Sequence, residues 1–565
     1  MSAAIVGNAS LTEFDVLVIG SGGGGGTISH MLTKLGLTVL VLEAGPNRFI
    51  GLDDPDNLPS STFSNDELKL SERNFIYPSL LTDPRTWRTS DSGTAVIADV
   101  NALPKTVGGG AVHADLKMPR FQPDDFHLGT LIQDKQGAAF ADWPVDYDML
   151  EPFYAYVERT IGVQGLMGSD PYAGPRSTDY PMPPGVGMYC ALLVAAGAEK
   201  IGLNPFPYPT AVNSRVYDGR PACVDCGYCS GYACPSNAKG SPPVTTLRRA
   251  LLTGKCQLRP ETRVAKLLLN GAKNEIVGVE AIGPDGARVT FKADRYVLAA
   301  SPIESARLCL LSDPDGVGNS SGQVGRNLMF HLQTEAAGIF EERVHGHRGR
   351  TVTHGFSDFR GKPNDPDHPL GGIVEISGSE FPIEEASRYV GILKMLGSFD
   401  GKMLKRLLRQ SPGRDRIVAL ALQAEDAPQS KNRADLDPRV RDVDGLPVAR
   451  VTYENHAFEL AARDFYSPKL VQLLGASGCK YALVSPKDPI PASAHIMGTL
   501  RFGSDKATSV CDENGKFHDV GNLFASDGSL FPTSSGFNPT LTIMALATRV
   551  GAAMVNPDSP ERGLD

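Results

Sequence analysis

The sequence predicts an α/β fold organised around a Rossmann-like nucleotide-binding unit near the N-terminus. Two short apolar runs, Val16–Ile19 and Val39–Leu42, have the length and composition of buried parallel strands. Between them lie a glycine-rich turn and a helical repeat that places Leu32 and Leu35 on one face. This order of strand, turn, helix and strand is the βαβ arrangement of dinucleotide-binding folds.

The glycine-rich turn carries the motif that such folds use to bind a diphosphate. Gly20, Gly22 and Gly25 fit G-x-G-x-x-G, and Glu43 closes the second strand about 20 residues further on. Gly20 permits the tight turn, Gly22 lets the backbone approach a diphosphate, and Gly25 lets the helix pack on the strand. The helix N-terminus adds partial positive charge. Glu43 is placed to bind a ribose 2′-hydroxyl and would repel the phosphate of NADP, so we expect NAD or FAD.

Composition and charge limit the classes of function that remain. The chain has 565 residues, 41% hydrophobic and 21% charged, which is ordinary for a soluble protein of two or more domains. Its net charge of −9 argues against a nucleic-acid partner, because phosphate binding needs a basic face. No window reaches the roughly 20 apolar residues of a membrane span, and the N-terminus does not resemble a secretory leader. We therefore expect a cytoplasmic protein.

A second group of signals lies near the C-terminus. Residues 522–534 predict a short apolar strand that ends at Asp527. Asn538 and Pro539 then precede small and apolar residues at helical spacing, and Pro539 suits the first helical position because its missing N–H leaves no bond unmade. The pattern predicts a helix whose N-terminus lies near the cofactor and stabilises negative charge there.

Separated blocks of the sequence, in order, resemble one family, the glucose-methanol-choline (GMC) oxidoreductases, whose members are FAD-dependent. The blocks are "VGGGAVHADLKMPRFQPDDF", "DWPVDYDMLEPFYAYVERTIGV", "RVAKLLL", "ADRYVLAASPIESARLCLLS", "VGRNLMFH", "AHIMGTLRFG" and "NLFASDGSLFPTSSGFNPTLTIMALATRV". The resemblance runs nearly from end to end and implies FAD as the cofactor.

The resemblance also implies which residues contact the flavin. The second glycine segment would cover the isoalloxazine, and "RVAKLLL" would lie on the adenine side. His113 stands where the related pyranose oxidases carry a histidine bonded covalently to the flavin; we expect contact, with covalent attachment as the alternative. The predicted cofactor-binding residues are Gly20, Gly22, Gly25, Glu43, Gly108, Gly109, Gly110, His113, Val264, Asp527, Pro539 and Thr540.

His495 and Asn538 form the predicted catalytic pair. Oxidation of an alcohol needs a base for the hydroxyl proton, and the ordinary pKa of histidine, near 6.5, suits that task. His495 matches the histidine base of the family, while Asn538 occupies a position that holds His or Asn in relatives. An amide does not take a proton at this pH, so we assign Asn538 to orienting the substrate oxygen.

The family resemblance predicts two discontinuous domains. The expected FAD-binding domain comprises residues 8–150, 212–330 and 486–560; the expected substrate-binding domain, an α+β cap with an antiparallel sheet, comprises 151–211 and 331–485. Strands of the cap are expected at 336–342, 371–378, 416–426 and 446–453. Residues 363–369 and 433–445 are expected to be turns and exposed loops.

Four cysteines crowd one segment in the pattern C-x₂-C-x₂-C-x₄-C-P: Cys223, Cys226, Cys229 and Cys234. Such a run in a reducing compartment indicates an iron–sulfur cluster or zinc rather than disulfides. The segment also resembles that of bacterial sugar and gluconate dehydrogenases of this family, which bind a three-iron cluster, although the second gap differs by one residue. We favour a metal-free loop packed near the flavin, and a cluster or zinc remains the alternative.

These observations predict an FAD-dependent oxidoreductase that oxidises the CH–OH group of an alcohol or sugar to a carbonyl. Hydride would pass to flavin N5, with oxygen, a quinone or a redox partner as electron acceptor. Two alternatives remain open: a hydroxynitrile lyase of the same fold with non-redox FAD, and an electron-transfer subunit that contains a cluster. Sequence does not distinguish among the alcohols and sugars.

Overall fold

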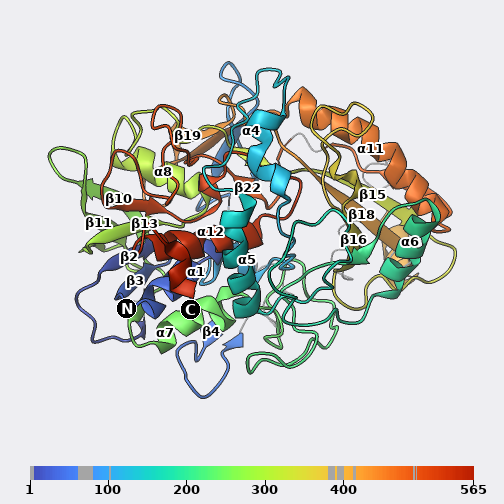
Figure 1. The fold of residues 1–565 in the computed structure, drawn as a ribbon, viewed down its shortest axis with the longest axis horizontal. Coiled ribbons are helices and arrows are strands. Elements are labelled where there is room, and N and C mark those ends of the chain that lie inside the picture. The colour runs from blue at the N-terminus through green and yellow to red at the C-terminus, as the bar shows by residue number, and fades with distance from the viewer. Residues whose placement is uncertain are drawn as a thin grey trace.

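A parallel sheet and an antiparallel sheet lie side by side and form the two halves of the molecule (Figure 1). The computed structural model describes residues 5–61, 80–100, 103–378, 389–390, 393, 400–410, 415–487, 490–491 and 493–564.

The parallel sheet confirms the predicted nucleotide-binding unit. Its strand order is β1-β9-β3-β2-β13-β23, with β1 antiparallel at one edge. β2 pairs in register with β3, from Val16 opposite Val39 to Ile19 opposite Leu42. Every residue of β2 and β3 is buried, as the apolar runs predicted. The strands are β1 (Val6–Gly7), β2 (Val16–Ile19), β3 (Val39–Leu42), β9 (Cys256–Arg259), β13 (Arg295–Leu298) and β23 (Leu523–Ala525).

Helices surround this sheet and separate it from the other half of the molecule. α12 packs against both α1 and α5, and Figure 1 shows α5 and α12 between the two sheets. α12 begins at Thr540 with Pro539 as its N-cap, one residue later than predicted. The helices are α1 (Gly23–Lys34), α5 (Tyr147–Ile161), α7 (Thr246–Leu252), α8 (Pro302–Ser312) and α12 (Thr540–Ala553).

The antiparallel sheet has the order β21-β15-β18-β17-β16-β8 and is covered by α6 (Tyr189–Lys200) and α11 (Ala457–Ala476). A separate apolar core fills the space between this sheet and the two helices. The strands predicted within 336–342, 371–378 and 416–426 are confirmed. The six strands are β8 (Phe206–Pro207), β15 (Leu332–Ile339), β16 (Val352–Phe356), β17 (Val374–Ser377), β18 (Ile417–Ala424) and β21 (Tyr481–Val484).

Two predictions for residues 433–453 are wrong. Residues 433–445, predicted to be loops, contain the strand β19 (Arg433–Arg441), and β20 (Pro447–Thr452) pairs with it instead of joining the cap sheet. These strands form a four-stranded sheet with β6 (Arg85–Arg88) and β7 (Val96–Ala98). Residues 433–445 were assigned to a loop because their acidic side chains suggested exposure to water. Asp435 instead accepts two hydrogen bonds from Arg450 of the next strand.

Smaller elements complete the described chain. β10 (Arg263–Leu269), β11 (Ile276–Ile282) and β12 (Arg288–Phe291) form a three-stranded sheet beside α8. β14 (Met329–Phe330) pairs with β22 (Ile496–Met497), and β4 (Phe49–Ile50) pairs with β5 (Ser60–Ser61). Two short helices are α4 (Leu128–Leu131) and α10 (Gly401–Gln410). Among the residues described, none of the helices combines the length and the apolar character needed to cross a bilayer.

Candidate active site

The predicted catalytic pair meets where the two halves of the molecule join. His495 directly precedes β22, and Asn538 lies two residues before α12. The His495 Nε2 and Asn538 Nδ2 atoms are 3.3 Å apart although the residues are 43 positions apart in sequence. Asn538 is buried and His495 is half-buried, so the surrounding chain restrains the geometry of the pair.

A second histidine determines which nitrogen of His495 carries the proton. His331 Nε2 lies 3.2 Å from the carbonyl oxygen of Ser534, and a carbonyl only accepts, so this nitrogen carries the hydrogen. Neutral His331 then has a bare Nδ1, which lies 2.9 Å from His495 Nδ1 and accepts its N–H. The hydrogen-bond network thereby assigns His495 the tautomer with a free lone pair on Nε2, the nitrogen that faces Asn538.

Asn538 is fixed in orientation by partners from two other elements. The Tyr208 hydroxyl donates to Asn538 Oδ1 at 2.6 Å, and Asn538 Nδ2 donates to Glu375 Oε1 at 2.9 Å. The amide nitrogen therefore directs its remaining N–H toward His495. Glu375 is in turn bound by Lys117, whose Nζ lies 2.5 Å from Glu375 Oε2. Asn538 cannot flip without losing two buried hydrogen bonds.

The electrostatic surroundings keep His495 neutral. Burial is the main cause that lowers the pKa of His495 well below its usual value near 6.5, and the positive charge of Lys117 lowers it further. Burial likewise lowers the pKa of His331 to about 4. For Lys117, burial opposes the charge, but the carboxylates of Glu375 and Asp115 outweigh it and raise the lysine pKa. The site thus combines an unprotonated imidazole with a permanently charged lysine.

Sequence reasoning missed four residues of this network: Lys117, Tyr208, His331 and Glu375. His331 ends the family-like block "VGRNLMFH", so its position was visible but its role was not. Glu375 had a signal in its own strand, since an isolated carboxylate within the apolar run 373–376 indicates a buried, partnered charge. Tyr208 and Lys117 carried no comparable pattern.

A large cavity adjoins the predicted catalytic pair, and predicted nucleotide-binding residues line it. Its volume is about 360 Å³. His495 lines it, together with predicted cofactor residues Gly20, Gly22, Glu43, Gly109, Gly110, Val264, Asp527, Pro539 and Thr540. Gly25, Gly108, His113 and Asn538 are not among the residues that line the cavity.

The glycine turn suits a diphosphate. α1 starts after Gly22 without a capping side chain, which leaves the first backbone N–H groups available to a ligand. Gly20 has a φ of +100°, and a Cβ there would lie 2.4 Å from the Ala299 carbonyl oxygen. A Cβ on Gly25 would lie 2.0 Å from the Gly20 carbonyl oxygen, so this glycine serves helix–strand packing as predicted.

Two buried carboxylates flank the same cavity. Glu43 accepts hydrogen bonds from the backbone N–H and hydroxyl of Ser21, at 3.0 and 2.7 Å, and from Gly45 N at 2.8 Å. Asp527 accepts from Ser529 N at 2.9 Å and from Ser305 Oγ at 2.7 Å. Burial raises the pKa of both groups. A glycine turn with free N–H groups beside a buried acid fits the diphosphate and ribose of a dinucleotide.

Comparison with known proteins identifies the family. Two family models described as GMC oxidoreductase match residues 188–333 and 428–547. The chain belongs to the GMC oxidoreductase family. The fold class is therefore confirmed as a Rossmann-like FAD-binding unit joined to a sheet-rich cap. The division into domains at the predicted boundaries stays a prediction.

Relatives of this GMC oxidoreductase cover almost the whole chain. A gluconate 2-dehydrogenase flavoprotein of Pantoea cypripedii is 29% identical and aligns over 95% of this chain and 92% of its own. A 2-methyl-1,2-propanediol dehydrogenase of Mycolicibacterium austroafricanum is 29% identical, with coverages of 96% and 95%. The crystal structure of pyridoxine 4-oxidase from Mesorbium loti superposes with a TM-score of 0.61 at 18% identity, over 95% of this chain and 98% of that one.

The cysteine segment of this GMC oxidoreductase lies close to the second glycine segment. The backbone N–H of Gly231 donates to the His113 carbonyl oxygen at 2.9 Å. Buried Lys239 donates to the carbonyl oxygens of Ala114, Cys229 and Tyr232, at 2.8 to 2.9 Å. The described residues include no group of three or more His, Cys, Asp or Glu side chains arranged to hold a metal ion. His113 is thus tied to the cysteine segment, and its contact with the flavin stays a prediction.

The thiols of this segment differ in acidity. Burial raises the pKa of Cys223 to about 11 and that of Cys229 to about 12. Burial also acts on Cys234, but hydrogen bonds from Ser236 and the positive charge of Lys239 outweigh it and lower the pKa of Cys234.

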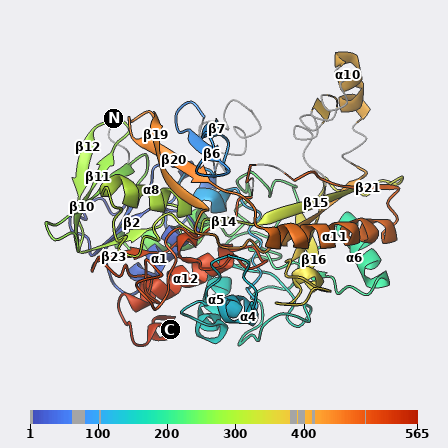
Figure 2. The same cartoon turned by 90° about the horizontal axis from the view of Figure 1, so that it is seen from above.

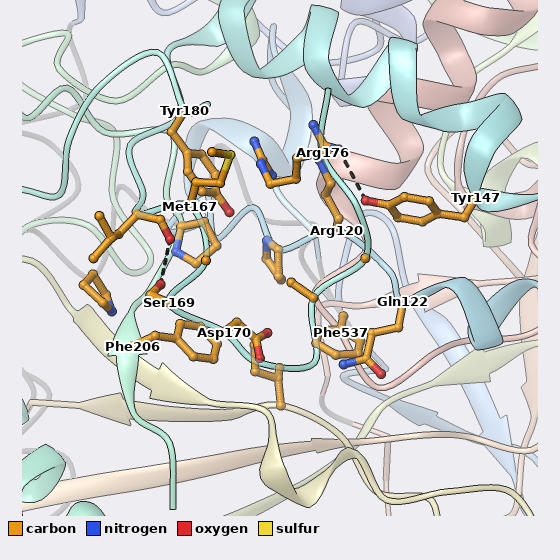
Figure 3. A pocket seen from close by; sticks show the side chains of 18 residues that line it. Arg120, Gln122, Tyr147, Met167, Ser169, Asp170, Arg176, Tyr180, Phe206 and Phe537 are labelled. Atoms are coloured by element: carbon orange, nitrogen blue, oxygen red, sulfur yellow. Dashed lines mark hydrogen bonds between the residues drawn. The ribbon is translucent and has the colours of Figure 1, made fainter. Parts of the chain in front are cut away.

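A second, smaller cavity, shown in Figure 3, lies next to Phe537, the residue before Asn538. Its volume is about 50 Å³. Phe537, which precedes Asn538, lines one side of it, and Arg120 and Arg176 line another. Glu158 binds both arginines, at 2.8 and 2.6 Å. Because their charges are already neutralised by carboxylates, these arginines support the wall of the site rather than form an anion-binding site.

Proposed function

We propose that this GMC oxidoreductase oxidises the CH–OH group of an alcohol or sugar to a carbonyl, with His495 as the base. The observation that carries the proposal is the contact at 3.3 Å between His495 Nε2, which the hydrogen-bond network assigns as unprotonated, and the amide nitrogen of Asn538. Bound FAD supplies the acceptor for the hydride that leaves the substrate carbon. The residues of the cavity, from Gly20 to Thr540, are proposed to hold it.

Each residue of the pair has one task in this proposal. The Asn538 N–H that faces His495 donates to the hydroxyl oxygen of the substrate, so that the O–H of the substrate points to His495 Nε2. His495 Nε2 takes the hydroxyl proton as the carbon–oxygen double bond forms, and the hydride would leave the carbon for the acceptor that FAD would supply. Tyr208 and Glu375 act earlier, by holding the amide in the orientation that presents this N–H.

The names of the relatives support a polyhydroxylated or simple alcohol substrate. One acts on gluconate and another on 2-methyl-1,2-propanediol, and both are dehydrogenases. We extend the CH–OH donor class to this chain, with oxygen, a quinone or a redox partner as the terminal acceptor.

Anaerobic mixing tests the proposal. The holoenzyme is combined with a panel of sugars, polyols and simple alcohols, and the visible absorbance of the flavin is followed. We expect at least one CH–OH donor to bleach the flavin, and bleaching to be lost in His495→Gln with FAD still bound. Cleavage of a cyanohydrin without any bleaching by the panel would instead identify the lyase.

A further inference from the structure

α10 is an amphipathic helix that stands apart from the rest of the described chain. Figure 2 shows it clear of both sheets, above the end of the molecule that carries β21. None of its ten residues is buried. Met403 is 50% exposed and Leu408 is 39% exposed.

Apolar and basic residues occupy opposite sides of α10. At 100° per residue, the four apolar side chains fall within an arc of about 140°. The basic side chains fall on the opposite side, and the helix has no acidic residue. The apolar set is Met403, Leu404, Leu407 and Leu408, and the basic set is Lys402, Lys405, Arg406 and Arg409. Four positive charges on one short helix contrast with a net charge of −9 for the chain.

The helix is too short to be stable through its own hydrogen bonds. Isolated helices of fewer than about 12–15 residues are marginal in water, and most helices gain their stability by packing an apolar face. α10 has such a face, but none of its four apolar side chains is fully buried: Met403 and Leu408 are exposed, and Leu404 and Leu407 are half-buried. A covering surface must therefore satisfy two conditions, since it has to accept apolar side chains and attract positive charge.

We propose that α10 docks the protein on an anionic lipid surface. Met403, Leu404 and Leu407 enter the boundary between headgroups and acyl chains, and the four basic side chains contact lipid phosphates. A helix with a strongly basic face and an apolar face lies in the plane of such a surface without spanning it. The proposal is independent of the reaction at His495, because α10 contributes no residue to the cavity.

Co-sedimentation of the holoenzyme with vesicles tests the proposal. One set of vesicles contains phosphatidylcholine alone, and the other also contains phosphatidylglycerol. We expect binding to the second set only, and release by added salt. Each basic residue near an anionic surface strengthens binding about five-fold. Reversing two charges in Lys405→Glu/Arg406→Glu should therefore weaken binding by at least about 100-fold.

A second variant tests the apolar face, and a third serves as the matched control. Met403→Ser/Leu407→Ser keeps every charge and should also lose binding. Leu192→Ser/Lys200→Glu changes an exposed leucine and an exposed lysine of α6 and should bind vesicles like wild type. Because none of these side chains is buried, all three variants should keep wild-type FAD content and melting temperature.

Three results would overturn the proposal. The first is a wild-type protein that binds neither kind of vesicle, and the second is equal binding to both kinds. The third is a wild-type dimer in sedimentation velocity that Met403→Ser/Leu407→Ser converts to monomers, without vesicle binding by either protein. That last result would assign the face of α10 to a second copy of the chain.

Discussion

At the scale of single residues, the site depends on the direction of a few N–H bonds. The Ser534 carbonyl fixes His331, and His331 fixes His495. On the other side, Lys117 holds Glu375, and Glu375 holds Asn538. One series of hydrogen bonds therefore orients the His495 imidazole, and another orients the Asn538 amide that faces it. The base and the orienting group should therefore fail in different ways when removed.

We predict that His495→Ala slows anaerobic flavin reduction by about 10²–10⁴-fold and abolishes its pH dependence, because the general base is lost. Asn538→Ala should slow it by roughly 10-fold and keep the pH profile, because a neutral hydrogen bond is lost. Stopped-flow reduction measures both, and FAD content serves as the control for folding. Loss of the pH dependence in Asn538→Ala alone would reverse the assignment of roles.

The charge of Lys117 should be visible in the pH profile. The folded pKa of His495 is depressed, so the wild-type rate should fall only well below pH 6.5 as the base is protonated. Lys117→Met removes a positive charge and leaves Glu375 uncompensated, and both changes raise the pKa of His495. The acid limb of flavin reduction should shift to higher pH. The exposed-surface control Lys431→Met should not shift it, and an unmoved limb in Lys117→Met would refute the electrostatic role.

At the scale of elements, two glycines of the β2–α1 turn have different roles, one in packing and one in ligand binding. Gly25 allows the helix to pack on the strand, whereas Gly22 faces the cavity, where a Cβ would meet its nearest atom, Gly109 Cα, at 3.9 Å. One glycine is needed by the fold and the other by the ligand.

We predict that Gly25→Ala lowers the free energy of unfolding of the apoprotein by about 1–3 kcal/mol, the usual cost of overpacking. Gly22→Ala should leave apoprotein stability nearly unchanged but weaken FAD binding, since its methyl group enters the cavity. Denaturant unfolding without FAD and titration with FAD measure the two effects. Equal loss of apoprotein stability in both variants would contradict these different roles of Gly22 and Gly25.

The cysteine segment leads to a prediction of its own. We expect far less than one iron or zinc per chain, because Lys239 and backbone carbonyls already organise the loop. Metal analysis of protein purified without chelator tests this, together with the visible spectrum, which should be that of flavin alone. Three or four irons with matching sulfide would establish a cluster instead.

Local patterns in the sequence predicted some parts of this molecule and could not predict others. The strands around the glycine turn, and the pairing of His495 with Asn538, follow from short motifs. The hydrogen bond between Tyr208 and Asn538 joins residues 330 positions apart, and no local pattern encodes such a contact. β19 was missed for a related reason, since Asp435 and Asp437 look solvent-exposed until their partners Arg450 and Thr86 are brought beside them.

At the scale of the whole molecule, the cofactor cavity is built from segments distributed along the chain. It is lined by residues from Ile19 to Ile543, drawn from the parallel sheet, the second glycine segment, α8 and the start of α12. A ligand that fills it therefore holds many elements together at once.

We predict that FAD stabilises the entire fold by mass action. Free FAD at about 100 times its dissociation constant should raise the free energy of unfolding by about 2.7 kcal/mol. Thermal unfolding of apoprotein over a series of FAD concentrations should show a single transition that moves upward. Gly22→Ala should need more FAD for the same shift, and a melting temperature independent of FAD would contradict the placement of the cofactor.

The position of β23 at the edge of the parallel sheet has a consequence for how the protein is made. Within that sheet β23 pairs with β13, and Asp527, Pro539 and Thr540 follow it in the chain as the last wall of the cavity. During synthesis on the ribosome, the glycine turn emerges first and must wait for more than nine-tenths of the chain before its ligand is enclosed. Nascent chains thus expose an open nucleotide site for almost the whole of translation, and cofactor capture becomes one of the final events of maturation.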